Sequence, residues 1–106
     1  HENWKNAIVN AKETDTVFLN RMHSPALCAL RTDKTTRLEN SPEVNAMAEF
    51  GKAIDLYFGG DMESAIALTG QVCGRIDSVR SVRDILEDVR REFFETLEAM
   101  SNRYLG

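Results

Sequence analysis

The chain has 106 residues, with 13 lysines and arginines, 17 aspartates and glutamates, and a formal net charge of −4. This length fits one domain with a single core. Charges of both signs are interspersed, so the sequence offers no basic face for a phosphate backbone, and we expect no nucleic-acid partner. No apolar run approaches the roughly twenty residues of a membrane helix. Two cysteines, Cys28 and Cys73, are too few for a disulfide scaffold or a metal cluster, so we expect reduced thiols in a cytoplasmic protein.

The first predicted element is an amphipathic helix. Its apolar residues recur at i, i+3, i+4 and i+7, which places Trp4, Ala7, Ile8 and Ala11 on one face. This helix is predicted to end near Glu13.

Two short apolar runs follow, at residues 16–22 and 26–31, separated by His23, Ser24 and Pro25. They predict a hairpin or an extended corner. The alanines and leucines of the second run would suit a helix equally well. Residues 32–40 are polar, show no periodicity, and are predicted to form a loop.

A longer helix is predicted to begin at Ser41 and Pro42, an N-cap hydroxyl followed by a residue that is harmless in the first turn. Gly59 and Gly60 are expected to end it with a left-handed cap. Asp61 is then expected to start a short helix that runs to residue 70. The apolar stripe of the longer helix would consist of Val44, Met47, Ala48, Gly51, Ile54 and Phe58.

The last predicted element is a long amphipathic helix that begins after Ser81, with Asp84 completing a variant of the capping box. Arg83 with Glu87, and Glu87 with Arg91, are spaced for i, i+4 ion pairs on its polar side. Its apolar face would carry Val82, Ile85, Leu86, Val89, Phe93, Leu97 and Met100.

The most informative motif is the loop that contains Gly70, Gln71 and Gly74. Glycines let another surface approach the backbone, and one amide side chain supplies both a donor and an acceptor. Such a loop can contact a flat ligand. Alternatively, it is a tight bend in which the glycines only permit close packing, and the residues alone leave both interpretations open.

The order of the elements resembles the C-terminal region of the nitronate monooxygenases, also called 2-nitropropane dioxygenases, and of the related flavin-dependent enoyl-ACP reductases. The resemblance covers nearly the whole chain. It includes the opening helix with His1, Trp4 and Lys5, and the Gly-Gln-x-x-Gly element at residues 70–74. It also includes the segments VFLNRM, SPALCALRTD and DLYFGGDMESAIALTGQVCGRID and the final helix.

The resemblance implies that this is one α+β domain, mainly helical, over residues 1–106, with about four helices and a short extended pair. It would be the C-terminal cap of an FMN-binding TIM-barrel enzyme, or a fragment of one, since the chain begins at His1. The barrel with its phosphate-binding loops and catalytic base would lie upstream. The resemblance places Gly70 and Gln71 nearest the flavin and assigns no catalytic residue and no metal ligand to this chain.

Several other residues have competing interpretations. His23 in a turn is expected to be solvated, and His1 to be structural. Cys73 is expected to be packed and not reactive, because Arg75 is the one cationic residue beside it in the sequence. Asp15 is expected to be a cap and not an acid.

Asp61 and one apolar stripe can also be interpreted as either structural or functional. The stripe consists of Met47, Ile54 and Phe58, with Tyr57 beside it. Asp61 is expected to be a cap. The stripe is expected to be core, although it would also suit the lining of an acyl or nitroalkane pocket.

Three functions follow. The favoured one is the cap of an FMN-dependent nitronate monooxygenase, which oxidises alkyl nitronates with molecular oxygen; NAD(P)H-dependent enoyl-ACP reduction is the alternative chemistry. The others are a free-standing helical interaction domain and a small ligand-binding domain that uses Gln71. The expected partners are a small-molecule substrate and flavin, both held through the barrel. Homo-oligomerisation stays open.

Overall fold

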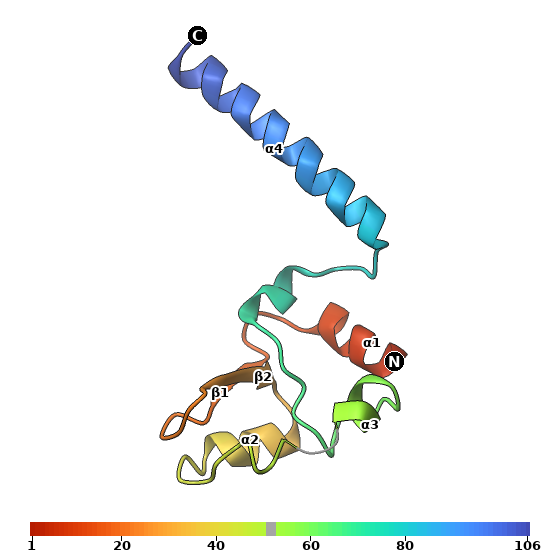
Figure 1. The fold of residues 1–106 in the computed structure, drawn as a ribbon, viewed down its shortest axis with the longest axis vertical. Helices are drawn as coiled ribbons and strands as arrows, with labels where there is room; N and C mark the ends of the chain where they lie inside the picture. The colour runs from red at the N-terminus through yellow and green to blue at the C-terminus, as the bar shows by residue number, and fades with distance from the viewer. Residues whose placement is uncertain (51–52) are drawn as a thin grey trace.

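The computed structural model describes residues 1–50 and 53–106 and consists of a small body and a long helical arm (Figure 1). Its radius of gyration is 18.0 Å and its extents are 56 × 30 × 20 Å. A compact chain of about 100 residues has a radius of gyration near 13 Å, so the arm is held well away from the body. The described residues contain four α-helices and one two-stranded sheet, which confirms a mainly helical α+β fold.

Helix α1, Glu2–Asn10, supplies one wall of the core. Ile8 is buried in a cluster with Leu30, Leu56, Ala65, Ala67 and Cys73, and Trp4, Ala7 and Ala11 pack against that cluster. The predicted apolar face is therefore confirmed. The helix ends three residues earlier than expected, because Ala11 is extended and the Asp15 carboxylate accepts a hydrogen bond from the Lys12 amide at 2.9 Å.

Strands β1, Thr16–Leu19, and β2, Leu27–Leu30, form an antiparallel hairpin, so the second apolar run is a strand. Thr16 pairs with Leu30 and Leu19 pairs with Leu27. Val17, Leu19 and Ala29 are buried in a second cluster with Ala46 and Ile66.

The prediction of a loop over residues 32–40 is wrong, because helix α2 spans Asp33–Glu39. Thr32 and Thr35 form a reciprocal capping box, in which the Thr35 amide donates to Thr32 Oγ1 and the Thr32 amide donates to Thr35 Oγ1. The buried Thr35 hydroxyl also donates to the Leu30 carbonyl at 2.8 Å. These bonds satisfy the amides of the first turn, so a polar sequence without an apolar period still forms a helix.

The long helix predicted from Ser41 is also wrong. Residues 41–50 form turns, and helix α3 spans only Ala53–Tyr57. Asn20 explains much of the difference, because its side-chain oxygen accepts a hydrogen bond from the Ala46 amide at 2.9 Å. That amide is therefore unavailable to a helical ladder, and Ala46 is buried against the hairpin.

The α3 segment buries Leu56, whereas Ile54 and Phe58 of the expected stripe are 74% and 80% exposed. Gly51 of that stripe lies outside the described residues. The left-handed C-terminal cap is confirmed, since Gly60 has φ = 75° and its amide donates to the Leu56 carbonyl.

The short helix predicted from Asp61 to Gly70 is wrong as well. The Asp61 carboxylate accepts hydrogen bonds from the Glu63 and Ser64 amides, so it caps a turn. The chain then runs extended along β2: the Leu30 amide donates to the Ala67 carbonyl, and the Thr69 amide donates to the Cys28 carbonyl. This segment is extended because successive side chains are buried on opposite sides of it. Ala65 and Ala67 pack in one buried cluster, and Ile66 packs in the other.

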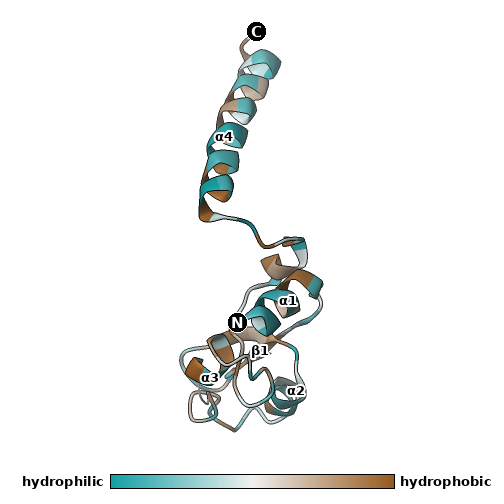
Figure 2. Ribbon diagram, turned by 90° about the vertical axis from the view of Figure 1, so that its right-hand side faces the viewer, coloured by the Kyte–Doolittle hydropathy of each residue, from teal (hydrophilic) through white to brown (hydrophobic). Residues whose placement is uncertain are grey.

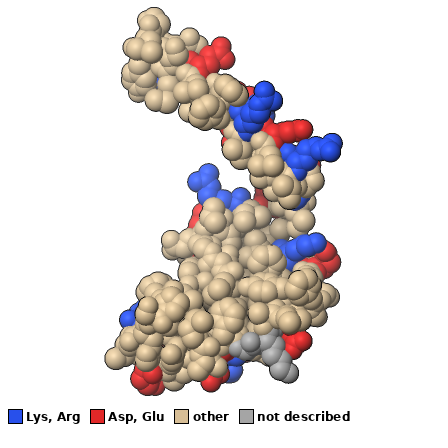
Figure 3. Space-filling model, in the orientation of Figure 1, with Lys and Arg blue, Asp and Glu red and all other residues tan. Residues whose placement is uncertain are grey.

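Helix α4, Val82–Tyr104, confirms the last prediction, and its Ser81 hydroxyl accepts a hydrogen bond from the Asp84 amide. Within the described part of the chain, its ion pairs are not those expected at Arg83 and Glu87. Arg91 pairs instead with Asp88 and Glu95, and Arg80 also pairs with Asp88. Figure 2 shows hydrophobic segments recurring along α4, and Figure 3 shows its charged groups gathered along one edge of the arm.

The two arginines hold the pKa of Asp88 below its ordinary value, chiefly through side-chain hydrogen bonds. A carboxyl group whose pKa is lowered by folding stabilises the folded helix above its unfolded-state pKa. This contribution is lost as the pH falls through the lowered value. Within the described residues, none of the helices combines the length and apolar composition needed to cross a bilayer.

The side chain of Asn20 is expected to be a major determinant of body stability. It donates to the Pro25 carbonyl at 2.6 Å and accepts from the Ala46 amide, and Asn20 itself has φ = 63°. Asn20→Ala leaves the Ala46 amide buried without a partner, so we predict a loss of about 2–3 kcal/mol in urea unfolding. Asn6→Ala, at an exposed position of α1, should change stability by less than about 0.5 kcal/mol. Equal unfolding midpoints for the two variants would contradict this role.

Candidate functional site

The loop singled out in the sequence forms a short 3-10 helix, η1, Gln71–Arg75, with Gly70 at its N-terminal cap. The Cys73 amide donates to the Gly70 carbonyl at 3.1 Å, which closes the turn. Gly70 has φ = −102°, an ordinary value, and a Cβ atom placed there would meet no atom within 4 Å. The backbone conformation therefore does not require glycine at position 70, and the surface beside it is open.

Gly74 has the opposite environment. A Cβ atom there would lie 2.3 Å from the Glu13 amide nitrogen and 2.8 Å from the Lys12 carbonyl carbon. Cys73 beside it is fully buried against the end of α1, as the packing interpretation predicted. The close-packing interpretation of the loop therefore holds for Gly74, which lets η1 dock on the segment after α1.

Gln71 faces outward from this docked turn. In the part of the chain that the structure describes, its exposed side-chain amide has no hydrogen-bond partner. It lines an open depression of about 440 Å³ over the outer face of the hairpin. The other lining residues are Thr16, Val17, Phe18, Cys28 and Glu39.

Charged side chains border this depression on the side of α2. Glu39 lies 3.0 Å from Arg31 and 3.6 Å from Arg21, measured between carboxylate oxygen and guanidinium nitrogen. The Arg21 guanidinium also lies over the Phe18 ring, 5.8 Å from its centroid. The depression thus combines an aromatic surface, a free amide and a carboxylate held between two cations.

Sequence reasoning found Gln71 but missed Phe18, Cys28 and Glu39. The available signal was strand alternation: Phe18 and Cys28 form a cross-strand pair on the face opposite the buried Val17 and Ala29. Glu39 could not be found in this way, because its position depends on the unpredicted helix α2.

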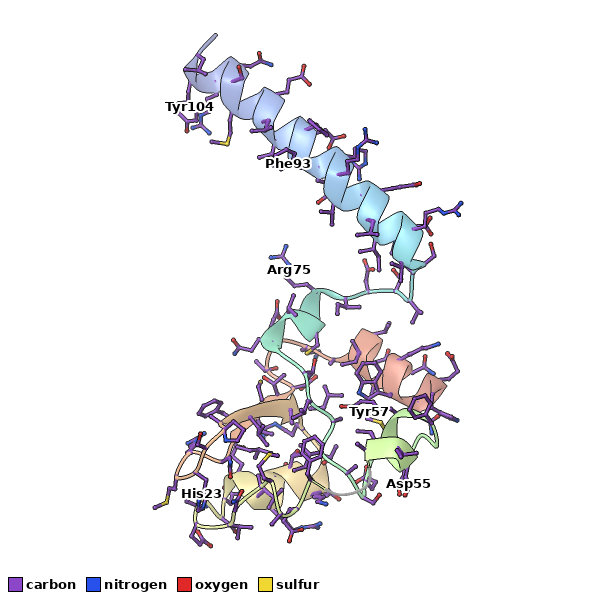
Figure 4. All side chains as sticks on the ribbon, in the orientation of Figure 1. His23, Asp55, Tyr57, Arg75, Phe93 and Tyr104 are labelled. Atoms are coloured by element: carbon purple, nitrogen blue, oxygen red, sulfur yellow. The ribbon has the colours of Figure 1, made fainter. Side chains whose placement is uncertain are left out.

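The remaining candidates lie elsewhere. One ring nitrogen of the exposed His23 is 3.0 Å from the Glu43 carbonyl oxygen, and Figure 4 places His23 at the far end of the body from Arg75 of η1. Tyr57 packs edge-on against Trp4 at 5.3 Å, and the ring of His1 lies against Gly60. The core interpretation was wrong for Met47, Ile54 and Phe58, which are all exposed.

A second open depression, of about 300 Å³, lies between the end of α1, the end of β2 and the turn around Met62. Its lining includes the apolar residues Ala7, Ala11 and Leu30 and the charged residues Asp15 and Arg31. Both charged groups already have partners, since Asp15 binds the Lys12 amide and Arg31 binds Glu39. This depression was not predicted from the sequence.

The depression beside Gln71 offers partners for only some of the groups of FMN. A flat ring edge fits its aromatic surface and free amide. The phosphate needs a cluster of backbone amides or free cations, and the arginines described at this depression are engaged by Glu39. The residues therefore fit one edge of a flavin and not a complete flavin site. Over residues 1–50 and 53–106, no group of three His, Cys, Asp or Glu side chains is arranged to hold a metal ion.

The chain is similar over almost its whole length to solved structures of FabK from Thermotoga maritima. FabK matches 97% of the chain at 30% identity with a TM-score of 0.81, and a point mutant of FabK matches 97% at 28% identity with a TM-score of 0.77. These matches cover 34% and 32% of the two FabK chains, so this chain spans about a third of their length. No protein-family model and no curated protein matches the sequence.

Similarity in both sequence and fold supports a relation to flavin-dependent oxidoreductases. Within that class, the structures matched are those of FabK, a flavin-dependent enoyl-ACP reductase of a nitronate monooxygenase-like family. The matched structures thus come from one of the groups of enzymes that the sequence resembles.

The two glycines of the loop provide a matched pair of tests. Gly74→Ala places a methyl group against the backbone of Lys12 and Glu13, and we predict a loss of about 1–3 kcal/mol in thermal or urea unfolding. Gly70→Ala has open space around it and should change stability by less than about 0.5 kcal/mol. Similar losses for both variants would show that η1 is not docked as described.

Proposed function

We propose that this chain is the C-terminal part of a flavin-dependent oxidoreductase of the FabK type, in which it closes one side of the flavin and substrate pocket. The observation that carries the proposal is the similarity to FabK over 97% of the chain, with a TM-score of 0.81. In this proposal the whole protein reduces enoyl thioesters with NAD(P)H in the cytoplasm.

The sequence alone favoured nitronate oxidation, and that chemistry stays a prediction. Both matched structures are FabK structures, and this observation favours enoyl reduction as the first candidate. The Gly-Gln-x-x-Gly element at residues 70–74 belongs to the resemblance with both groups and does not separate them.

Gln71 would contribute to the pocket by hydrogen bonding. Its free amide is held at the edge of the depression by η1, which Cys73 and Gly74 anchor to the end of α1. Pointing outward, it can donate to or accept from a flavin edge or a substrate oxygen without breaking an existing bond. Gly70 leaves the neighbouring backbone accessible.

When bound, FMN would supply the electron-transfer chemistry. The residues of this chain would orient the ligand and enclose one side of it. Phe18 presents an apolar surface, and Glu39, which also lines the depression, forms ion pairs with Arg21 and Arg31. We assign no proton transfer to this chain. The base would belong to the barrel, as the family resemblance implies.

The substrate class is tested on the complete protein encoded by the natural reading frame. We predict NAD(P)H oxidation that depends on an enoyl thioester, and only background oxygen uptake with an alkyl nitronate. The reverse result would replace enoyl reduction by nitronate oxidation. Activity with neither substrate would contradict the proposal and favour an interaction domain.

In the complete protein, Gln71→Ala is predicted to weaken flavin or substrate binding about 5- to 100-fold, because one hydrogen bond is lost from a closed pocket. Flavin dissociation and the KM for the thioester are the measurements. The unfolding midpoint of the flavin-free protein should not change, since the Gln71 side chain is exposed and the structure gives it no bond. Asn6→Ala removes another exposed amide, on α1 and outside the depression, and should change neither binding constant. Identical constants for Gln71→Ala and the parent protein would remove Gln71 from the site.

A further inference from the structure

The apolar face of α4 has no cover. Phe93, at the middle of the helix, is 59% exposed, and no residue of α4 is buried. The residues of this face recur at three- and four-residue steps, which places them on one side of the helix. They are Val82, Ile85, Leu86, Val89, Phe93, Leu97, Met100 and Tyr104.

This face is long and the opposite face is already satisfied. A helix of 23 residues is about 35 Å long. On its polar side Arg91 is bonded to Asp88 at 2.9 Å and to Glu95 at 3.1 Å. Contiguous apolar surface of this size on a protein marks an interaction site.

Exposed large apolar side chains also occur outside the helix. Val72 of η1 and the linker residues Ile76 and Val79 are also exposed large apolar side chains. Figure 4 shows Phe93 and Tyr104 leaving α4 on the same side, and Arg75 extending from η1 towards that side. Exposed apolar side chains therefore occur on α4, on the linker and on η1, and these segments run in different directions in Figure 1. One straight partner helix covers a single stripe, whereas a broad body can contact all three segments.

The FabK structures indicate where such a body lies in the sequence. A match to 97% of 106 residues leaves about three residues outside, so it includes α4. The TM-score of 0.81 indicates that the matched part of FabK has a similar overall arrangement. The match covers only 34% of the FabK chain, so about two thirds of that chain is available to fill the angle between arm and body.

We propose that the apolar face of α4, together with Val72, Ile76 and Val79, is the docking surface for the remaining part of the same polypeptide. This inference rests on the proposed function, because it requires the longer FabK-like protein. The occupant is covalently attached, so docking does not depend on protein concentration. Arg75 lies beside this surface and has no partner in the described part of the chain, which suits an acidic or carbonyl group on the occupant.

Amide hydrogen exchange of the complete protein, followed in the peptides of α4, is the test. We expect α4 to exchange at least about tenfold more slowly than it does in the isolated 106-residue chain, with equal protection at low and high protein concentration. Protection that is lost on dilution, together with a dimer in light scattering, would assign the face to a second copy and overturn the proposal. Fast exchange of α4 at every concentration would also overturn it.

Two neighbouring phenylalanines supply matched variants. Phe93 lies in the centre of the apolar face, whereas Phe94 lies off it beside Arg90. Phe93→Ala should speed the exchange of α4 in the complete protein about tenfold or more, and Phe94→Ala should have a much smaller effect. Equal effects would overturn the assignment of this face.

The two proposals can fail separately. A protein that reduces an enoyl thioester but exchanges α4 quickly would lose only the docking surface. A protein that protects α4 independently of concentration but neither carries flavin nor reduces the thioester would lose the proposed function and keep the docking surface.

Discussion

The apolar face of α4 is not covered by any described part of the chain, and this exposure limits how the helical arm can be stabilised. A 23-residue helix that buries none of its side chains gains nothing from the small core beside it. Its ion pairs are solvent-exposed and contribute little stability. A lasting position for this arm would need contacts beyond those described within the chain, and the match to FabK covers only 34% of the FabK chain.

The body holds the residues of the candidate site in fixed positions. The extended segment of residues 65–67 joins its two buried clusters. Ala65 and Ala67 pack in one cluster, and Ile66 packs in the other. The hairpin and η1 are fixed on this base, and they bring Phe18, Cys28 and Gln71 to one open depression. The chain thus orients groups at an edge, whereas a complete flavin site also needs the phosphate-binding elements that the resemblance assigns to a barrel.

The sequence predicted best where local signals agreed with the packing. The cap at Ser81, the period of α4, the face of α1 and the glycine cap at Gly60 all follow from short-range chemistry. The errors occurred where distant residues decide: the bond between Asn20 and the Ala46 amide prevents the expected helix from forming around residue 46. At the candidate site, Gln71 could be identified from its glycine neighbours. The position of Glu39 depends on helix α2, which Thr32 and Thr35 cap, and the polar residues of this segment had instead predicted a loop.

The most direct test of the central claim is the visible flavin spectrum of the complete protein, compared with that of residues 1–106 alone after incubation with FMN. The account predicts a yellow complete protein with nearly stoichiometric flavin and a colourless 106-residue chain, because this chain supplies one edge of the pocket. A colourless complete protein that takes up no FMN would contradict the relation to flavin enzymes. Tight FMN binding by the isolated chain would contradict the division between supporting body and barrel.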